Sequence, residues 1–378
     1  MPHPKATKSQ GTLPSASRGR KQISTERTFS VLAPAGIPSL RAALLDWYHA
    51  NKRDLPWRRT EDPYAIWVSE IMLQQTRVAA VIDRYHAFLE RLPTVTALAL
   101  ASEQEILALW SGLGYYRRAR MMHKAAQSLA ANHQSALPST SADLRKLPGI
   151  GAYTSAAIAS IAHGEPIAVV DGNVERVICR LAGWEEPTGS GVTAQDREIH
   201  AFANRFLDPA HPGDFNQAMM ELGATICLPR NPQCTACPLF TGCTTRGEHK
   251  TTPRPKMQSR SIAYALVLRK ARSRQSTQEI LLEQRSPAQS VMPGLWELPM
   301  LHIPEVPDED QLLSVRHSIM QINYNVRVRS ATAQTVRTLT VKGGERHWIP
   351  LTQASSLPLT GLARKILKRL KLLPTALS

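Results

Sequence analysis

A glycine-bearing turn that opens a helix of small residues constrains the fold of this chain more than any other stretch. Residues 147–173 read LPGIGAYTSAAIASIAHGEPIAVVDGN. Gly149 and Gly151 permit positive φ and let the backbone approach another molecule closely. The run from Ala152 to Ala162 then predicts a tightly packed helix. A turn of this kind directs backbone N–H groups outward at the start of the helix, which suits a phosphate.

The acid at the end of this stretch is the first candidate functional residue. Asp171 follows the apolar run Ile167–Val170 and precedes Gly172, so its carboxylate is expected at the edge of a core rather than in free solvent. Spacing alone leaves two interpretations open. Asp171 is either a reactive acid or an ordinary helix N-cap in a helix-turn-helix.

Composition and charge limit the kind of partner. The 378 residues leave room for two or three domains. Lys and Arg number 46 against 30 Asp and Glu, and the resulting charge of +16 favours a polyanion, either nucleic acid or an anionic membrane face. No uncharged apolar stretch approaches the length of a membrane helix, and the N-terminus lacks the apolar core of a secretory signal.

A second candidate acid lies in PYAIWVSEIMLQQTR. A helix predicted over Tyr64–Leu92 places Glu70 on one face with Ile66, Leu73 and Arg77. Apolar neighbours would raise the pKa of this carboxyl, which suits a general acid near neutral pH. The alternatives are an exposed glutamate paired with Arg77 and a helix N-cap.

Further helices are predicted over 96–109, 117–132, 174–182, 194–206 and 215–226. Between the first two lies LWSGLGYYRRAR, residues 109–120. Its glycines, tyrosines and arginines suit a loop that contacts bases and phosphates. The alternative is a helix cap with core aromatic residues.

Four of the five cysteines are clustered, as Cys227, Cys234, Cys237 and Cys243. An odd number of cysteines argues against a secreted disulfide framework and for a metal site in a reducing compartment. The spacing C-x6-C-x2-C-x5-C lacks the paired C-x2-C halves of most zinc ribbons and suits four thiolates around an iron–sulfur cluster. A zinc site is the alternative. Cys179, in an apolar helix, is predicted to be a buried, inert thiol.

From about Ser39 to Cys243 these motifs resemble the MutY family of adenine DNA glycosylases, within the helix-hairpin-helix superfamily of endonuclease III. The resemblance is carried in order by RDLPWR, PYAIWVSEIMLQQTRV, LWSGLGYYRRAR, LPGIG, VVDGNVERV, FNQAMMELGA and the cysteine loop. It implies a mainly α catalytic region of two helical subdomains with a 4Fe-4S cluster, and an α+β Nudix-like C-terminal domain. It also implies double-stranded DNA as the partner and removal of a flipped-out adenine that is mispaired with 8-oxoguanine or guanine.

The resemblance also assigns roles to residues. Glu70 matches the general acid that protonates N7 of adenine, and Asp171 matches the carboxylate that stabilises the oxocarbenium-like sugar. Tyr153 and Asn173 match residues that position Asp171 and the attacking water. Tyr153 also stands where endonuclease III has a lysine, so the resemblance implies base excision without an efficient lyase step. The matching substrate- and DNA-contacting positions are Arg53, Leu55, Trp57, Arg58, Leu73 and Glu221 around adenine, Gln75, Thr76, Leu113 and the wedge Tyr115 near the opposite base, and Gly149 and Gly151 on the DNA backbone.

The predicted organisation has four parts. They are a disordered basic arm (1–36), the catalytic region (37–245, with the iron–sulfur loop at 227–243), a basic linker able to recruit repair proteins (246–260), and the Nudix-like domain (261–378). Strands are predicted over 262–268, 279–284 and 326–328, and a closing helix over 362–370. The last domain contains no REx2EExG run, so no pyrophosphatase activity is expected.

One departure from the family affects the substrate. Where relatives carry Phe-Ser-His, this chain reads Ile319-Met320-Gln321, so the usual serine and histidine donors to 8-oxoguanine are missing. Two alternatives to the main prediction follow: a related monofunctional glycosylase with altered opposite-base specificity, and a non-catalytic lesion-binding protein. We expect a monomer away from membranes, in the cytoplasm at the nucleoid of a bacterium or in the nucleus or mitochondrion of a eukaryote.

Overall fold

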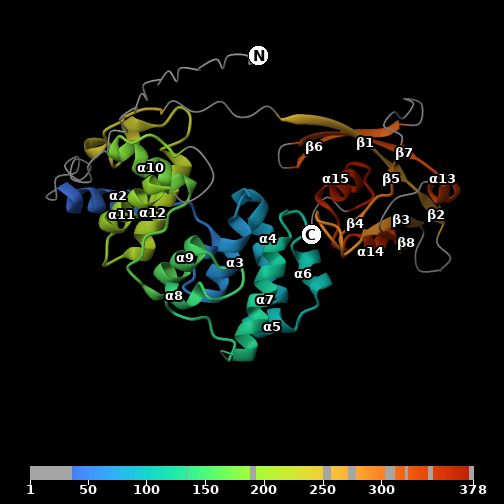
Figure 1. Ribbon diagram of the computed structural model, residues 1–378, viewed down its shortest axis with the longest axis horizontal. Helices are drawn as coiled ribbons and strands as arrows, with labels where there is room; N and C mark the ends of the chain where they lie inside the picture. Colours follow the sequence, from blue (N-terminus) through green and yellow to red (C-terminus); the bar gives the residue numbers. More distant parts are fainter. Residues whose placement is uncertain are drawn as a thin grey trace, which may run out of the picture.

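A helical N-terminal region and a C-terminal region of two β-sheets with helices make up the chain in the computed structural model (Figure 1). The structure describes residues 36–132, 134–187, 193–249, 257–270, 278–302, 311–319, 322–338 and 344–373. The predicted basic arm up to residue 35, residues 250–256 of the predicted linker, and Met320 and Gln321 lie outside the described residues. Among those that are described, no helix combines the length and hydrophobicity that a membrane crossing requires.

The helical region packs around two separate hydrophobic cores. The first includes Trp67, Phe88 and Trp110, and the second includes Phe206 and Phe215. Around the first core lie η2 (Pro56–Arg58), α3 (Pro63–Leu73), α4 (Val78–Arg91), α5 (Val95–Leu100), α6 (Glu103–Leu109), α7 (Arg117–Asn132), α8 (Ser141–Leu144) and α9 (Ala152–His163). Around the second lie α2 (Ile37–Asn51), α10 (Gly172–Ala182), α11 (Ala194–Phe206) and α12 (Pro212–Thr225).

The predicted helices over 117–132, 174–182 and 194–206 are confirmed, but the long helix over Tyr64–Leu92 is wrong. The chain breaks after Leu73, and Gln75 adopts a left-handed backbone with φ 54°. The guanidinium of Arg118 lies at the end of α3 and donates to the carbonyl oxygens of Ile71, Met72 and Gln74, at 2.6, 3.0 and 2.6 Å. A distant arginine therefore satisfies the carbonyl groups that a helix C-terminus leaves without partners.

The predicted helix over 96–109 is also divided, because Ser102 begins a new helix. The Ser102 hydroxyl accepts a hydrogen bond from the Glu105 N–H and so caps α6. Serine is a strong N-cap, and periodicity alone does not separate two short helices whose apolar faces point toward the same core.

The glycine-bearing turn before α9 forms as predicted. Gly149 has φ 78°, and a Cβ atom on it would lie 2.5 Å from the Cβ of Met121. Both the left-handed backbone and the close approach of α7 therefore require glycine here. Small side chains let α9 pack closely, and the chain then returns through 164–170 to Asp171, the N-cap of α10.

The C-terminal region consists of two four-stranded sheets that share a core with α15 (Gly361–Arg369). In the first sheet the order is β5 (Met300–Leu301), β1 (Gln258–Leu266), β7 (Ile322–Ser330), β6 (Gln311–Ile319), with β1 parallel to β7. In the second, β3 (Gln278–Arg285) pairs along one edge with β8 (Gly344–Pro350) and along the other with β2 (Leu268–Lys270) and β4 (Trp296–Glu297). The remaining helices are α13 (Ala333–Thr338) and α14 (Leu351–Ala354). The predicted strands and closing helix fall within or overlap these elements.

The Arg118 contacts give a stability prediction. Arg118→Met should lower the free energy of unfolding by about 2–4 kcal/mol, because it leaves the α3 carbonyl groups without donors in a partly buried setting. Urea unfolding of the two proteins would measure the difference. Arg117→Met, on the exposed neighbouring residue, is the matched control and should change stability by less than about 0.5 kcal/mol. Equal effects of the two substitutions would contradict the capping role.

Candidate active site

A cavity of about 600 Å³ lies between the two helical cores. Its walls come from η2, α3, the start of α9, the start of α10 and α12. Twelve of the predicted residues line it: Arg53, Leu55, Trp57, Arg58, Glu70, Leu73, Gln75, Thr76, Tyr153, Asp171, Asn173 and Glu221. Segments separated by more than 150 residues of chain thus meet at one site.

Glu70 is a buried acid at this cavity. It lies on α3 and is 5% exposed, and its Oε2 accepts a hydrogen bond of 2.7 Å from the Tyr153 hydroxyl. Burial raises the pKa of Glu70 to about 7, with a further increase from the nearby Asp171, although the Tyr153 hydrogen bond and the charge of Arg58 oppose the rise. The structure therefore rejects the alternative of an exposed glutamate paired with Arg77.

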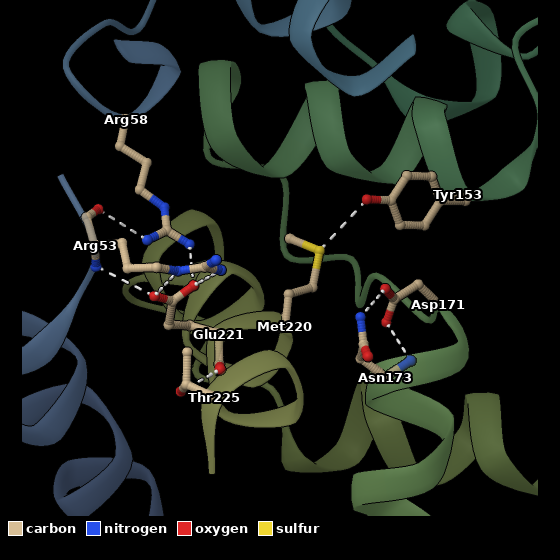
Figure 2. Close-up of polar contacts among 8 residues, drawn as sticks. All are labelled: Arg53, Arg58, Tyr153, Asp171, Asn173, Met220, Glu221 and Thr225. Carbon is tan, nitrogen blue, oxygen red and sulfur yellow. Dashed lines mark hydrogen bonds and ion pairs between the residues drawn. The ribbon is translucent and has the colours of Figure 1, made fainter. Parts of the chain in front are cut away.

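The Tyr153 hydroxyl hydrogen-bonds to Glu70, and its part in positioning Asp171 stays a prediction. Its hydroxyl carries one proton, and the 2.7 Å distance to Glu70 is shorter than the 3.4 Å to Sδ of Met220. Burial raises the pKa of Tyr153 well above its ordinary value, so the phenol stays neutral and keeps its proton to donate. Figure 2 shows the Met220 thioether pointing toward this hydroxyl from α12. Met220 was missed, although it directly precedes Glu221 in the FNQAMMELGA motif.

Asp171 satisfies both interpretations of the sequence, because it caps α10 and also lines the cavity. One carboxylate oxygen accepts from the backbone N–H groups of Asn173 and Val174, at 2.9 and 2.8 Å, and the other accepts from the Asn173 side chain at 2.9 Å (Figure 2). Arg176 donates to the Asn173 amide oxygen at 3.0 Å and so fixes the orientation of that amide. Three N–H donors therefore fix the position of this carboxylate at the N-terminus of α10.

A third carboxyl, Glu221 on α12, is 1% exposed and is held by two arginines. Arg53 donates to both of its oxygens, at 2.7 and 2.6 Å, and Arg58 donates to one at 2.8 Å (Figure 2). Burial disfavours the ionised form, but the hydrogen bonds from the two arginines outweigh it and lower the pKa of Glu221 to about 2. This cluster ties the segment before α3 to α12 and gives the cavity one rigid polar wall.

The loop between α6 and α7 stands beside the cavity rather than in its wall. Tyr115 is 53% exposed and has φ 45°, directly after Gly114 with φ 70°. The Thr76 hydroxyl donates to the Leu113 carbonyl at 3.3 Å, so Gln75 and Thr76 adjoin this loop. The turn of Gly149 and Gly151 lies before α9 and likewise is not part of the cavity lining.

The four clustered cysteines line a second, small cavity of about 30 Å³ together with Arg180, Phe240 and Arg246. Two short helices, η3 (Cys234–Ala236) and η4 (Phe240–Gly242), shape this loop. Arg180 approaches the Cys227 sulfur at 3.5 Å and donates to the carbonyls of Leu228 and Pro229. Within the described residues no three His, Cys, Asp or Glu side chains are arranged to hold a single metal ion. Cys179 is fully buried, and burial raises its pKa to about 12, as expected for an inert thiol.

Comparison with known proteins places this site in a family context. Residues 68–201 match the HhH-GPD superfamily of base excision DNA repair proteins. The adenine DNA glycosylase of Homo sapiens is 46% identical over 221 residues, which cover 56% of this chain and 40% of the human protein. That of Arabidopsis thaliana is 37% identical over 308 residues, which cover 71% of this chain and 48% of the plant protein. The chain therefore spans less than half the length of these two relatives.

A solved structure agrees with the fold of the helical region. A thermostable thymine-DNA glycosylase matches with a TM-score of 0.51 and 28% identity, and the match covers 56% of this chain and 97% of that protein.

The buried Glu70 predicts a pH dependence of stability. Its pKa is about 7 in the folded protein against an ordinary 4.5, so between these values the unfolded chain loses the proton first. The contribution of Glu70 to the free energy of unfolding is present below pH 4.5 and is lost as the pH rises to 7. The free energy of unfolding of Glu70→Gln, relative to that of the native protein, should therefore rise by about 2–3 kcal/mol from pH 5 to pH 8.

Urea unfolding at several pH values would measure this gain. Glu90→Gln, on an exposed glutamate of α4, is the control. Its free energy of unfolding should change with pH in parallel with that of the native protein. Parallel curves for Glu70→Gln as well would show that Glu70 ionises normally.

Proposed function

Since the chain belongs to the HhH-GPD superfamily and its relatives are MutY-family adenine DNA glycosylases, we propose that it excises adenine mispaired with 8-oxoguanine or guanine. The observation that carries this proposal is the presence of Glu70 and Asp171 on one cavity, the first buried so that its pKa rises to about 7 and the second held by three N–H donors. Two carboxyl groups with separate environments are the general solution to glycosidic cleavage. The reaction would be one step of base excision repair.

The adenine must leave the duplex before it reaches Glu70, which lies inside the protein. The exposed Tyr115 is suited to enter the base stack in its place. Leu55, Trp57 and Leu73 would contact the faces of the base, and the wall of Arg53, Arg58 and Glu221 would meet its polar edge. A cavity of about 600 Å³ is within the usual size of a small-molecule site.

In the chemical step Glu70 would donate its proton to N7 of adenine while the glycosidic bond breaks. The Tyr153 hydroxyl, at 2.7 Å, would hold the carboxyl in place and stabilise the carboxylate that forms. Asp171 would stabilise the positive charge that develops on the sugar. Asn173 would help to orient Asp171 and the attacking water. Hydrolysis would leave the hydroxyl of this water on C1′ and the Glu70 proton on the released base, and the proton that the water loses would restore Glu70.

The proposed reaction stops at base removal. A strand-cleaving glycosylase forms a Schiff base through an amine, and no lysine is among the described residues that line the cavity. Tyr153 occupies the corresponding position, and a phenol cannot form an imine. We therefore assign the chain a monofunctional glycosylase activity.

The cysteine loop fits a 4Fe-4S cluster better than a single ion. In such a cluster each of the four thiolates binds a different iron atom, so the sulfur atoms surround a cavity and do not converge on one point. Cys227, Cys234, Cys237 and Cys243 line a cavity of this kind, and Arg180 and Arg246 beside them would balance the negative charge of a thiolate-bound cluster. Its contribution would be structural, because it would hold the loop in shape.

The C-terminal region is proposed to be the Nudix-like domain that reads the opposite base. β6 and β7 pair up to Ile319 and Ile322, so residues 320–321 connect them. Ile319 therefore ends a strand at the connection where relatives carry Phe-Ser-His. The serine and histidine of the relatives are replaced here by Met320 and Gln321. The loss of these usual donors favours a second candidate function, an adenine glycosylase that discriminates weakly between 8-oxoguanine and guanine.

A non-catalytic lesion-binding protein is the least supported candidate, because Glu70, Tyr153 and Asp171 are all in place on one cavity. The proposed partner is double-stranded DNA, in keeping with the charge of +16. The protein would act as a monomer at the bacterial nucleoid, or in the nucleus or mitochondrion of a eukaryote. The linker would remain available to repair proteins.

Single-turnover release of adenine tests the function directly. Duplexes carrying adenine opposite 8-oxoguanine, guanine or cytosine should show release from the first two, with the strand cut after hot alkali but not before. Glu70→Gln should slow release by about a hundredfold to ten-thousandfold, because it removes the proton donor.

The outcomes of this experiment separate the candidates. Equal rates opposite 8-oxoguanine and guanine would favour the weakly discriminating enzyme. Tight binding of the mispaired duplexes with no release of base from any of them would favour the lesion-binding protein.

The cysteine loop gives an independent prediction. Cys237→Ser should lose iron and acid-labile sulfide and should weaken DNA binding more than the chemistry of the protein that remains, because the cluster shapes the loop. Metal analysis and DNA titration would measure both effects. Cys179→Ala, at a buried thiol outside the loop, should keep its iron. Loss of iron with unchanged DNA binding would argue against a structural role.

A further inference from the structure

Three hydrogen bonds in a buried joint connect the loop of Tyr115 to the C-terminal region. The hydroxyl groups of Ser111 and Tyr116 both donate to the carbonyl oxygen of Leu359, at 3.2 and 2.9 Å. Nε of Arg364, on α15, donates to the Ser111 hydroxyl at 2.8 Å. Ser111, Tyr116 and Leu359 are at most 3% exposed, so water does not compete for these bonds. Figure 1 shows the start of α7 facing the C-terminal region at this point.

On the C-terminal side, the residues before and after Leu359 are both hydrogen-bonded to the domain core. The N–H of Trp296 in β4 donates to the Pro358 carbonyl at 3.0 Å, and the N–H of Thr360 donates back to the Trp296 carbonyl at 2.8 Å. Thr360 also caps α15. The position of the Leu359 carbonyl is therefore set by β4 and α15 together.

The same helix is bonded to the strand that ends at the proposed opposite-base hairpin. Nζ of Lys365 on α15 donates to the Arg316 carbonyl in β6 at 2.7 Å. β6 runs three residues further to Ile319. A continuous set of contacts thus leads from β6 through α15 to the joint.

On the helical side, several hydrogen bonds hold the loop that carries Tyr115. Arg118 donates to the carbonyls of Leu113 and Gly114, at 3.1 and 3.2 Å, and Trp110 donates to the same Gly114 carbonyl at 3.2 Å. The Arg118 guanidinium also lies 5.7 Å from the centroid of the Tyr115 ring. A shift of Tyr116 would consequently be passed on to Tyr115, because the rest of the loop does not give way.

We propose that Ser111, Tyr116 and Arg364 are positioning residues that couple the seating of the C-terminal region on DNA to the insertion of Tyr115 at the adenine. This inference rests on the proposed function. A C-terminal region seated on the opposite base would hold the Leu359 carbonyl in place. This carbonyl would in turn hold Tyr116 at the position from which the neighbouring Tyr115 enters the base stack. Base flipping would then be favoured at sites where both strands are recognised.

The substitution Tyr116→Phe tests the coupling with a minimal change, because it removes one hydroxyl and keeps the ring. A second contact, from Arg120 to the Pro293 carbonyl at 2.7 Å, remains to keep the two regions docked. The matched control is Tyr64→Phe. Tyr64 is equally buried, and its hydroxyl also donates to a backbone carbonyl, that of Leu92 at 2.7 Å, but within the helical region.

Two measurements on the full chain separate positioning from folding. The first is the fluorescence increase when the protein extrudes 2-aminopurine placed opposite 8-oxoguanine. The second is the affinity for a duplex with a stable abasic site opposite 8-oxoguanine, which presents no base to flip. Tyr116→Phe should lower the extrusion equilibrium about threefold to tenfold, the value of one hydrogen bond. Its affinity for the abasic duplex should stay within about twofold of the native protein, and Tyr64→Phe should match the native protein in both measurements.

The alternatives overturn the inference in distinguishable ways. An extrusion equilibrium of Tyr116→Phe equal to that of the native protein would show that the joint does not act on Tyr115. An equal loss in both measurements would show a general structural effect. If Tyr116→Phe does not fold, Ser111→Ala removes the neighbouring hydroxyl and should give the same selective loss. Failure of the native protein itself to extrude or release a base would overturn the proposed function and this inference together.

Discussion

The burial of one carboxyl group, that of Glu70, determines how the rest of the cavity is arranged. A carboxyl removed from water retains its proton to higher pH, and a proton donor near neutral pH requires this. Asp171, by contrast, is only partly buried, and three N–H donors at the start of α10 hold its carboxylate. Glu221 is also buried, and the hydrogen bonds from Arg53 and Arg58 lower its pKa to about 2. Three carboxyl groups at one cavity thus have three different environments because each has different neighbours.

Much of this site could be predicted from the sequence, because its residues lie in short motifs whose local structure the sequence determines. Asp171 was expected at the edge of a core from the apolar run before it, and the structure places it at the cavity as an N-cap. The helix over 117–132 was also correct, since its apolar residues recur at the helical period. The break after Leu73 was not predicted, because it depends on Arg118, 44 residues beyond Gln74 in the chain. Periodicity carries no information about a cap supplied from that distance.

Side-chain partners were harder to predict than positions. Tyr153 was predicted to position Asp171, and its hydrogen bond to Glu70, 83 residues away, was not predicted. The hydrogen bond between Tyr116 and Leu359 joins residues 243 positions apart. Such contacts follow from how helices and sheets pack in three dimensions, and a single sequence read by pattern does not contain them. The chemistry of a site can therefore be anticipated from residue types, while the contacts that position those residues require the structure.

The conformation of Tyr115 links these contacts to function. An exposed tyrosine with φ 45° is unfavourable by about 1–3 kcal/mol relative to an ordinary backbone, and it persists where its surroundings determine it from several sides. Here Arg118 and Trp110 hold the residues before it, and the joint at Leu359 holds the residue after it. A purely structural loop would gain stability by relaxing this tyrosine onto the surface. Retention of a strained, exposed ring between two such anchors is instead what a side chain requires if it is to enter a base stack without first being ordered.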